Sequence, residues 1–484
     1  MIRIYFDWNI ISNLKTQEYK NILDFTSLHK NIILAPYSQA HFTDLLKSYH
    51  PKNKYFEQDL EMLDRICDKY LLSRGKDGLE PSFALPSEYF ETQKGKPNPL
   101  DLVDIDKVFG PDVEDLFRET ESNSPVTDLK NILDSLPSGI DITDDNGDTL
   151  KKMFLNLTPE SSVLDLIRDL GSFMQKVMTD KSFIKELRQV TADQGYTVKH
   201  EYGNWASDAV MKNMDIFLKK KNPDLGLTFD KFVEMSYTKQ NNSYDFHDQY
   251  ISEYLLLDML GYCSDKLKKK SNNFQNIIAD AMHSFYASHC DYLVTIDKNL
   301  IEKSRVLYSK YNVGTKIISP EAMVGEISRR IESEYKKESF FSHVFEYCQD
   351  ANCVAEGKND IEGKTETLVF ELPTYHFNYY NYLIQRYYSE ENIVLFTFKQ
   401  DIQGFTNFHY FAEMESVFDS ITEFFGYDDF SDLNSTRRDY IYSDKNISLH
   451  WTFEGGKICL DKDEVTNKSV LTYLLEVDEF ETAK

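Results

Sequence analysis

Residues Asn276–Leu300 read NIIADAMHSFYASHCDYLVTIDKNL, and this stretch decides how the rest of the chain is interpreted. Its first half has apolar residues at helical spacing, namely Ile277, Ile278, Ala281 and Phe285. We therefore predict a helix that carries Asp280, a carboxylate that is costly among apolar neighbours unless it is paired or binds metal. A short strand, 292–296, then runs directly into Asp297. An acidic residue after a buried parallel strand lies at the carboxyl edge of the sheet, where α/β folds place their sites.

The first fifty residues repeat this arrangement of strands followed by polar residues. A hydrophobic strand, Ile2–Phe6, is followed by Asp7 and Asn9. A second strand, Ile32–Pro36, is followed by Ser38 and Asp44, which fall on the next predicted helix or at its start. The order strand, helix, strand, helix is typical of the beginning of a parallel sheet.

Together these motifs resemble the PIN-domain ribonucleases. The opening D-x-N of that family corresponds to Asp7-Trp8-Asn9, its closing pattern to Asp280 and to C-D-Y-L-V-T-x-D ending at Asp297, and its last strand to 315–320. The resemblance covers residues 1–50 and 240–325. It implies an α/β fold with a three-layer α/β/α core around a parallel sheet. One departure is Asp44, where family members usually carry the longer Glu.

The resemblance also implies a site and a chemistry. Four carboxylates, those of Asp7, Asp44, Asp280 and Asp297, would bind Mg²⁺ or Mn²⁺, which hard oxygen ligands favour. Such a metal lowers the pKa of a bound water and offsets charge on the leaving oxygen of a phosphodiester. Asn9 and Thr295 would assist by orienting a carboxylate, the substrate or a water. The implied activity is endonucleolytic cleavage, with RNA the favoured substrate and single-stranded DNA the alternative.

Other polar residues are candidates for contacts with the substrate. The set comprises Lys268, Lys269, Lys270, Lys298, Ser38 and His283. His283 follows Asp280 by three residues and His41 precedes Asp44 by three, so each histidine shares a helix face with an acid. Each could orient the carboxylate, bind metal or move a proton, or could be a structural histidine.

The remaining residues divide into two further regions. Residues 51–239 read as a mainly helical insertion, with loops around 73–112 where glycine and proline are frequent. Residues 326–484 read as an α+β domain for sensing or docking. Its predicted strands are 367–372, 392–398, 447–453 and 457–460, the last two joined as a hairpin. The aromatic residues of 375–382 are predicted to pack inside this domain, with stacking on unpaired bases as the alternative.

Composition limits the function classes. The chain has 484 residues, a formal net charge of −26, and six cysteines too scattered to form a disulfide framework. The negative charge argues against general nucleic-acid binding and favours a basic regulatory protein partner. No apolar run approaches the length of a membrane span, so we expect a cytoplasmic protein without a membrane partner. The oligomeric state does not follow from the sequence.

Three functions are therefore considered. The first is a metal-dependent endoribonuclease, by analogy with the family a regulated toxin or antiviral-defence effector. The second is a non-catalytic PIN-like scaffold or binding protein, which predicts that the acids do not cluster or do not bind metal. The third is a phosphatase similar to the haloacid dehalogenases, but that family requires an acid at the position of Asn9, which cannot serve as a general acid.

Overall fold

The computed structural model describes part of the chain in detail. The described residues are 1–48, 55–75, 78–93, 188–189, 192, 195–221, 227–231, 233, 246–264, 274–331, 352–358, 365–400, 410–426, 433–443, 447–453 and 455–476. The predictions for 94–187, and the lysines Lys268, Lys269 and Lys270, lie outside the described residues.

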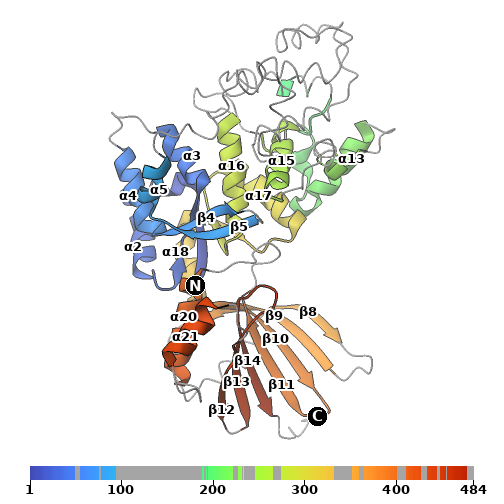
Figure 1. Ribbon diagram of the computed structural model, residues 1–484. Coiled ribbons are helices and arrows are strands. Elements are labelled where there is room, and N and C mark those ends of the chain that lie inside the picture. Colours follow the sequence, from blue (N-terminus) through green and yellow to red (C-terminus); the bar gives the residue numbers. More distant parts are fainter. Residues whose placement is uncertain are drawn as a thin grey trace, which may run out of the picture.

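A four-stranded parallel sheet organises the first and middle parts of the chain (Figure 1). Its order is β2-β1-β6-β7, with bounds Ile33–Leu34, Ile2–Phe6, Tyr292–Val294 and Lys316–Ile318. All three pairings are parallel. The central strands β1 and β6 are buried at every position, as expected for parallel strands covered on both faces. The four strands predicted from the sequence are thus confirmed.

Successive residues of β1 enter two different hydrophobic clusters. Ile4 and Phe6 belong to a cluster with α1, α2, α4 and α18, whereas Tyr5 belongs to a cluster with α15, α16 and α17. In the first cluster, α1 spans Trp8–Ile11, α2 Lys20–Leu28, α4 Phe56–Cys67 and α18 Pro320–Arg330. In the second, α15 spans Phe246–Met259, α16 Phe274–Ala287 and α17 Lys298–Tyr311. Because neighbouring side chains of a strand point to opposite faces, helices cover both faces of the sheet. The α/β class is confirmed.

A second, small sheet extends the core beyond the first fifty residues. Its order is β3-β4-β5, with bounds Tyr37–Ser38, Tyr70–Gly75 and Gly78–Phe83, and α3 (Gln39–Ser48) follows β3 directly. The predicted loop is therefore wrong for residues 73–75 and 78–83, which lie in the paired strands β4 and β5, and for α5 (Pro86–Gln93). The glycines that suggested a loop are Gly75 and Gly78, which pair where the hairpin turns, and Pro86 is the first residue of a helix, where proline is well tolerated.

The last part of the chain forms a seven-stranded antiparallel sheet with order β12-β13-β14-β11-β10-β9-β8 (Figure 1). In chain order from β8 to β14 the bounds are Asn352–Lys358, Thr365–His376, Tyr380–Tyr388, Ile393–Lys399, Leu449–Phe453, Gly456–Lys462 and Ser469–Glu476. Two helices, α20 (Phe411–Phe425) and α21 (Leu433–Tyr442), contribute to its hydrophobic core. The four predicted strands and the β12–β13 hairpin are confirmed, and β8, β10 and β14 are additional.

The aromatic residues of 375–382 are mostly buried in this structure. Tyr375, Phe377, Tyr379 and Tyr380 are each at most 6% exposed. Side chains so enclosed have no face left for a nucleic-acid base. The packing interpretation therefore holds for these four, and the base-stacking alternative is wrong for them.

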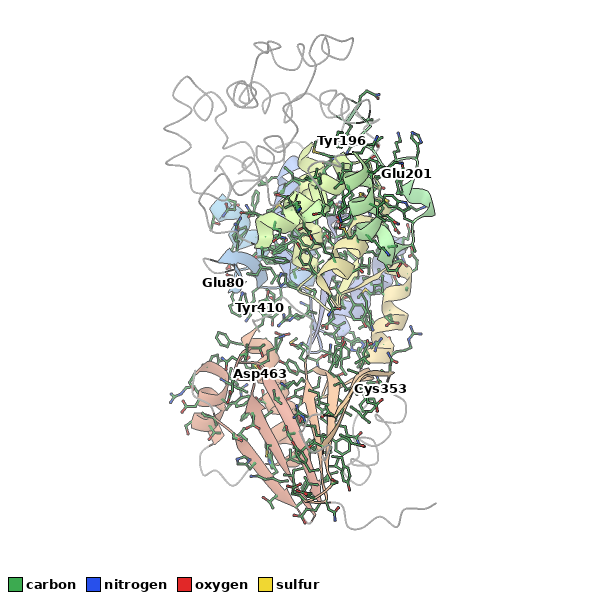
Figure 2. The ribbon with its side chains drawn as sticks, turned by 90° about the vertical axis from the view of Figure 1, so that its right-hand side faces the viewer. Glu80, Tyr196, Glu201, Cys353, Tyr410 and Asp463 are labelled. Atoms are coloured by element: carbon green, nitrogen blue, oxygen red, sulfur yellow. The ribbon has the colours of Figure 1, made fainter. Side chains whose placement is uncertain are left out.

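The C-terminal domain docks on the parallel sheet at the amino ends of its strands. Arg3 near the start of β1 forms an ion pair with Glu413 of α20. Tyr375 of β9 donates a hydrogen bond to Asp291, which immediately precedes β6 (3.1 Å). Tyr410 lies at the same junction in Figure 2 and donates to the carbonyl of Leu71 (3.2 Å). The carboxyl ends of β1 and β6 lie at the opposite edge of the sheet, where the sequence predicts the site.

None of the helices in the described ranges is both long enough and apolar enough to cross a bilayer.

Candidate functional site

The carboxyl ends of β1 and β6 bring Asp7 and Thr295 together. Phe6 pairs with Val294 in the parallel register, so the residue after each strand lies at the same level of the sheet. Thr295 donates its hydroxyl proton to Asp7 Oδ2 (2.8 Å), and the Asn9 amide donates to the same oxygen (3.2 Å). The contact of Asn9 with the Asp7 carboxylate agrees with its prediction, whereas Thr295, predicted to orient Asp297 or a water, donates to Asp7 instead.

Among the described residues, one oxygen of the Asp7 carboxylate accepts no hydrogen bond. Both of its bonds reach Oδ2, and although Asp7 stands at the N-terminus of α1 its side chain does not cap that helix. Asp7 is only 3% exposed. Burial raises the pKa of this carboxyl, and the negative charges of Asp44 and Asp297 raise it further, against the lowering effect of the Thr295 hydrogen bond. Such a group gains from a nearby cation.

Asp297 combines a structural role with a free oxygen. It is the N-cap of α17, and its Oδ1 accepts from the backbone N–H groups of Asn299 (2.8 Å) and Leu300 (3.0 Å). Its own N–H donates to Thr295 Oγ1 (3.1 Å). Asp297 Oδ2 accepts no hydrogen bond within the described residues. The cap fixes the carboxylate in place while leaving this second oxygen available.

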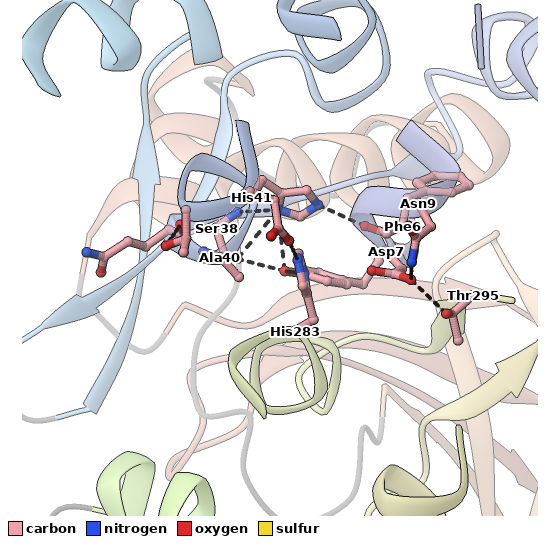
Figure 3. A network of polar contacts seen from close by, with 12 residues as sticks. Phe6, Asp7, Asn9, Ser38, Ala40, His41, His283 and Thr295 are labelled. Atoms are coloured by element: carbon pink, nitrogen blue, oxygen red, sulfur yellow. Dashed lines mark hydrogen bonds and ion pairs between the residues drawn. The ribbon is translucent and has the colours of Figure 1, made fainter. Parts of the chain in front are cut away.

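Asp44 is held by a histidine of another helix. Asp44 lies on α3 with its side chain 16% exposed, and His283 of α16 contacts its Oδ2 through Nε2 (3.0 Å). Nδ1 of His283 faces the hydroxyl of Tyr5 (2.9 Å) (Figure 3). Among the described residues, the acid that His283 contacts is Asp44 of α3, not Asp280 on its own helix, and its predicted contact with substrate stays a prediction.

Ser38 and His41 belong to the same buried cluster. Ser38 accepts from the backbone N–H of Ala40 (3.2 Å), so it stabilises the start of α3, and its hydroxyl contacts Tyr5 (2.7 Å). His41 Nε2 contacts the carbonyl oxygen of Phe6 (2.8 Å). Ser38 and His41 are fully buried, so the structural interpretation of His41 is favoured and the prediction of Ser38 as a substrate contact is wrong.

The other predicted residues have separate positions. Asp280 is half-buried on α16, one turn before His283, and takes no part in the hydrogen bonds of Asp7 or Asp297. Lys298 is exposed at the first position of α17, beside Asp297. The structure therefore associates Asp7, Asp297 and Asp44 and does not join Asp280 to them by a described contact.

A divalent cation held by protein alone needs several ligand side chains close together. Within the described ranges, no group of three or more His, Cys, Asp or Glu side chains is arranged to hold a metal ion. A cage built from protein alone is thus absent from that part of the chain. Mg²⁺, however, usually keeps several waters and is bound through one or two carboxylates together with substrate phosphates. The free oxygens of Asp7 and Asp297 fit that weaker mode of binding.

Tyr5 is a functional candidate that the sequence analysis missed. It lies on β1, two residues before Asp7, and its hydroxyl contacts Ser38, His41 and His283. The available signal was a tyrosine within a strand predicted to be buried, because a buried tyrosine hydroxyl needs a partner.

Comparisons with known proteins identify no relative. No protein-family model, no curated protein and no solved structure matches the chain. The interpretation of the site therefore depends on its own geometry.

Proposed function

We propose that the chain is a metal-dependent nuclease that hydrolyses phosphodiester bonds, with RNA as its substrate. The observation that carries this proposal is the state of Asp7. Its carboxylate is buried beside the charges of Asp44 and Asp297, with a raised pKa and an oxygen that accepts no hydrogen bond. Buried like charges with perturbed pKa values are a mark of functional sites.

The proposed roles follow from the contacts. Asp7 and Asp297 would hold Mg²⁺ or Mn²⁺ through their free oxygens, with Thr295 and Asn9 fixing the orientation of Asp7. When bound, such a metal supplies a water of lowered pKa and compensates charge on the phosphate. Lys298 is exposed next to Asp297 and is placed to attract a phosphate. Asp280 remains a candidate ligand only through the family resemblance.

The arrangement of the sheet supports the same proposal. The order β2-β1-β6-β7, helices on both faces and acids after β1 and β6 are what a three-layer PIN-like core would have. The choice of RNA over DNA, and a role as a regulated toxin or defence effector, come from that resemblance and are part of the proposal. A basic protein partner remains the proposed regulator.

A non-catalytic PIN-like scaffold is the second candidate. It is favoured by the lack, within the described ranges, of three side chains arranged around a metal, and by the contact between Asp44 and His283. The phosphatase is disfavoured because Asn9 donates to Asp7, whereas that mechanism needs an acid at this position.

The test is cleavage of labelled tRNA, single-stranded RNA and single-stranded DNA with Mn²⁺, with Mg²⁺ or with EDTA. Asp7→Asn and Asp297→Asn should each abolish cleavage. The matched control is Glu302→Gln, which makes the same chemical change on α17 at a solvent-exposed ion pair with Arg305. Cleavage that persists in both aspartate variants would contradict the proposal. If wild-type protein neither cleaves nor binds Mn²⁺ in calorimetry, the scaffold is the better description.

A further inference from the structure

A buried tyrosine hydroxyl lies at the centre of the cluster beside the candidate site. Tyr5 is 0% exposed, and its hydroxyl lies 2.7 Å from Ser38 Oγ, 2.9 Å from His283 Nδ1 and 3.3 Å from His41 Nδ1 (Figure 3). Three partners from β3, α3 and α16 thus converge on one oxygen of β1. A tyrosine hydroxyl has a single proton, so only one of the three can receive it.

The fixed acceptors determine which nitrogen of each histidine carries hydrogen. His41 Nε2 faces the carbonyl oxygen of Phe6, and His283 Nε2 faces the carboxylate of Asp44. A carbonyl and an ionised carboxylate can only accept, so each Nε2 must be the donor. In a neutral imidazole, Nδ1 is then an acceptor.

His41 already has a donor for its Nδ1. The backbone N–H of Ser38 points to it (3.1 Å). Burial lowers the pKa of His41 to about 3, which agrees with a neutral ring. The proton of Tyr5 is therefore available to His283 Nδ1, the closer of the two imidazole acceptors.

We propose that Tyr5 is a positioning residue that fixes the tautomer and orientation of His283, and through it the carboxylate of Asp44. The hydrogen bonds run in one direction: Ser38 Oγ–H donates to Tyr5, Tyr5 O–H donates to His283 Nδ1, and His283 Nε2–H donates to Asp44. With its Nε2 as the donor, His283 holds one oxygen of the Asp44 carboxylate in a fixed position (3.0 Å). The inference rests on the proposed function, in which the charge of Asp44 lies beside the metal-binding Asp7.

Among the described residues, His283 Nδ1 has the Tyr5 hydroxyl as its one hydrogen-bond partner. His283 is 0% exposed, so solvent cannot replace a lost donor at Nδ1. In Tyr5→Phe the ring has to turn or move its proton to Nδ1, and in either case the hydrogen bond to Asp44 is weakened. Residues that orient the carboxylates around a metal site commonly change metal affinity by roughly tenfold or more when they are replaced.

The tautomers can be measured directly by nitrogen NMR of protein labelled at histidine, since the two neutral forms have distinct shifts. The chain has 11 histidines, and the signals of interest are assigned with His283→Gln and His41→Gln. We expect both residues to be protonated at Nε2 in the wild type, and His283 to lose this pure state in Tyr5→Phe. The matched control is Tyr250→Phe, which removes another buried hydroxyl in contact with α16, bonded to Ser284 (2.6 Å), and should leave His283 unchanged.

Each outcome has a defined meaning. A wild-type His283 protonated at Nδ1, or a His283 signal unaltered in Tyr5→Phe, would overturn the proposal. The wild-type spectrum decides the tautomer even where Tyr5→Phe does not fold. In parallel, Mn²⁺ affinity should fall roughly tenfold in Tyr5→Phe and stay constant in Tyr250→Phe. If the wild type shows the expected tautomers but neither binds Mn²⁺ nor cleaves nucleic acid, the hydrogen-bond path from Tyr5 to Asp44 is supported. The nuclease function is then contradicted.

Discussion

Arg3 and Glu413 are 410 positions apart in the chain and form a two-pronged ion pair that is closed to solvent. Arg3 donates from Nε to Oε1 (2.8 Å) and from Nη2 to Oε2 (2.6 Å) of Glu413, with both side chains at most 1% exposed. Glu413 also accepts the backbone N–H of Tyr410 (2.8 Å). The pair joins the central strand of the parallel sheet to the first helix that follows the C-terminal strands β8–β11. The C-terminal domain is therefore joined to the core by a buried contact at the edge opposite Asp7.

Breaking this pair on one side should be strongly destabilising. Glu413→Gln removes the carboxylate that pairs with the buried guanidinium of Arg3, and we expect a loss of about 3–5 kcal/mol in the free energy of unfolding. The double variant Arg3→Met/Glu413→Leu removes both charges of the pair and should lose much less. Urea unfolding of the three proteins tests this. A double variant that loses as much stability as Glu413→Gln would contradict it.

The same pair predicts instability in acid. Burial alone would raise the pKa of Glu413, but the charge and hydrogen bonds of Arg3 outweigh it and lower the pKa to about 2. The unfolded chain therefore binds the proton first as pH falls. The stabilisation is present above the ordinary value of 4.5 and is lost as pH falls towards 2. Thermal unfolding followed from pH 5 to pH 2 should show a steeper loss in the wild type than in Arg3→Met/Glu413→Leu. Equal slopes would assign the acid sensitivity to other groups.

The parallel sheet could be predicted because its signal is local. Ile2–Phe6 and 292–296 are apolar runs that end in an aspartate, and such runs indicate buried strands whatever surrounds them. The pairing of β1 with β6 could only be inferred from the resemblance, because the residues that join them are 288 positions apart, as in the bond from Thr295 to Asp7. The β4–β5 hairpin was missed because Gly75 and Gly78 indicate a turn but not the strands on either side.

The site could be predicted in part for the same reason. Asp7 and Asp297 follow strands, so their location at the sheet edge is set by the backbone. Asp44 and Asp280 lie on helices, where the rotation and tilt of each helix decide what a side chain meets. The contact between His283 and Asp44 depends on how α16 packs on α3, which tertiary packing fixes and local sequence does not. Tyr5 was missed because its partners come from two segments distant in the chain, 38–41 and the helix that carries His283.

The two roles of Asp297 can be separated by substitution. Asp297→Ala removes the cap of α17 and should cost about 1 kcal/mol in unfolding free energy. Asp297→Asn or Asp297→Ser keeps an oxygen that can accept the N–H groups of Asn299 and Leu300, so stability should change little. All three remove the carboxylate, and all three should lose metal-dependent cleavage. Denaturant unfolding and the cleavage assay, run on the same preparations, test this. Activity that follows stability across the three variants would mean that Asp297 acts only as a cap.

Asp7→Asn should make the protein more stable while removing its response to metal. Burial raises the pKa of Asp7, with Asp44 and Asp297 adding to the effect, so the folded protein binds this proton more tightly than the unfolded chain. Stability then falls as pH rises from the ordinary value of 3.8 through the raised pKa, and the cost persists at neutral pH. Replacing the carboxylate by a neutral amide removes that cost, and we expect a gain of about 1 kcal/mol at pH 7, as is common for residues kept for function. Mn²⁺ should raise the melting temperature of the wild type, because a ligand that binds only the folded state stabilises it, and should not raise that of Asp7→Asn. Thermal unfolding with Mn²⁺ and with EDTA measures both effects, with Glu302→Gln as the control that should behave like the wild type. A destabilised Asp7→Asn that still responds to Mn²⁺ would show that Asp7 is a structural carboxylate and that the metal, if it binds, is held elsewhere.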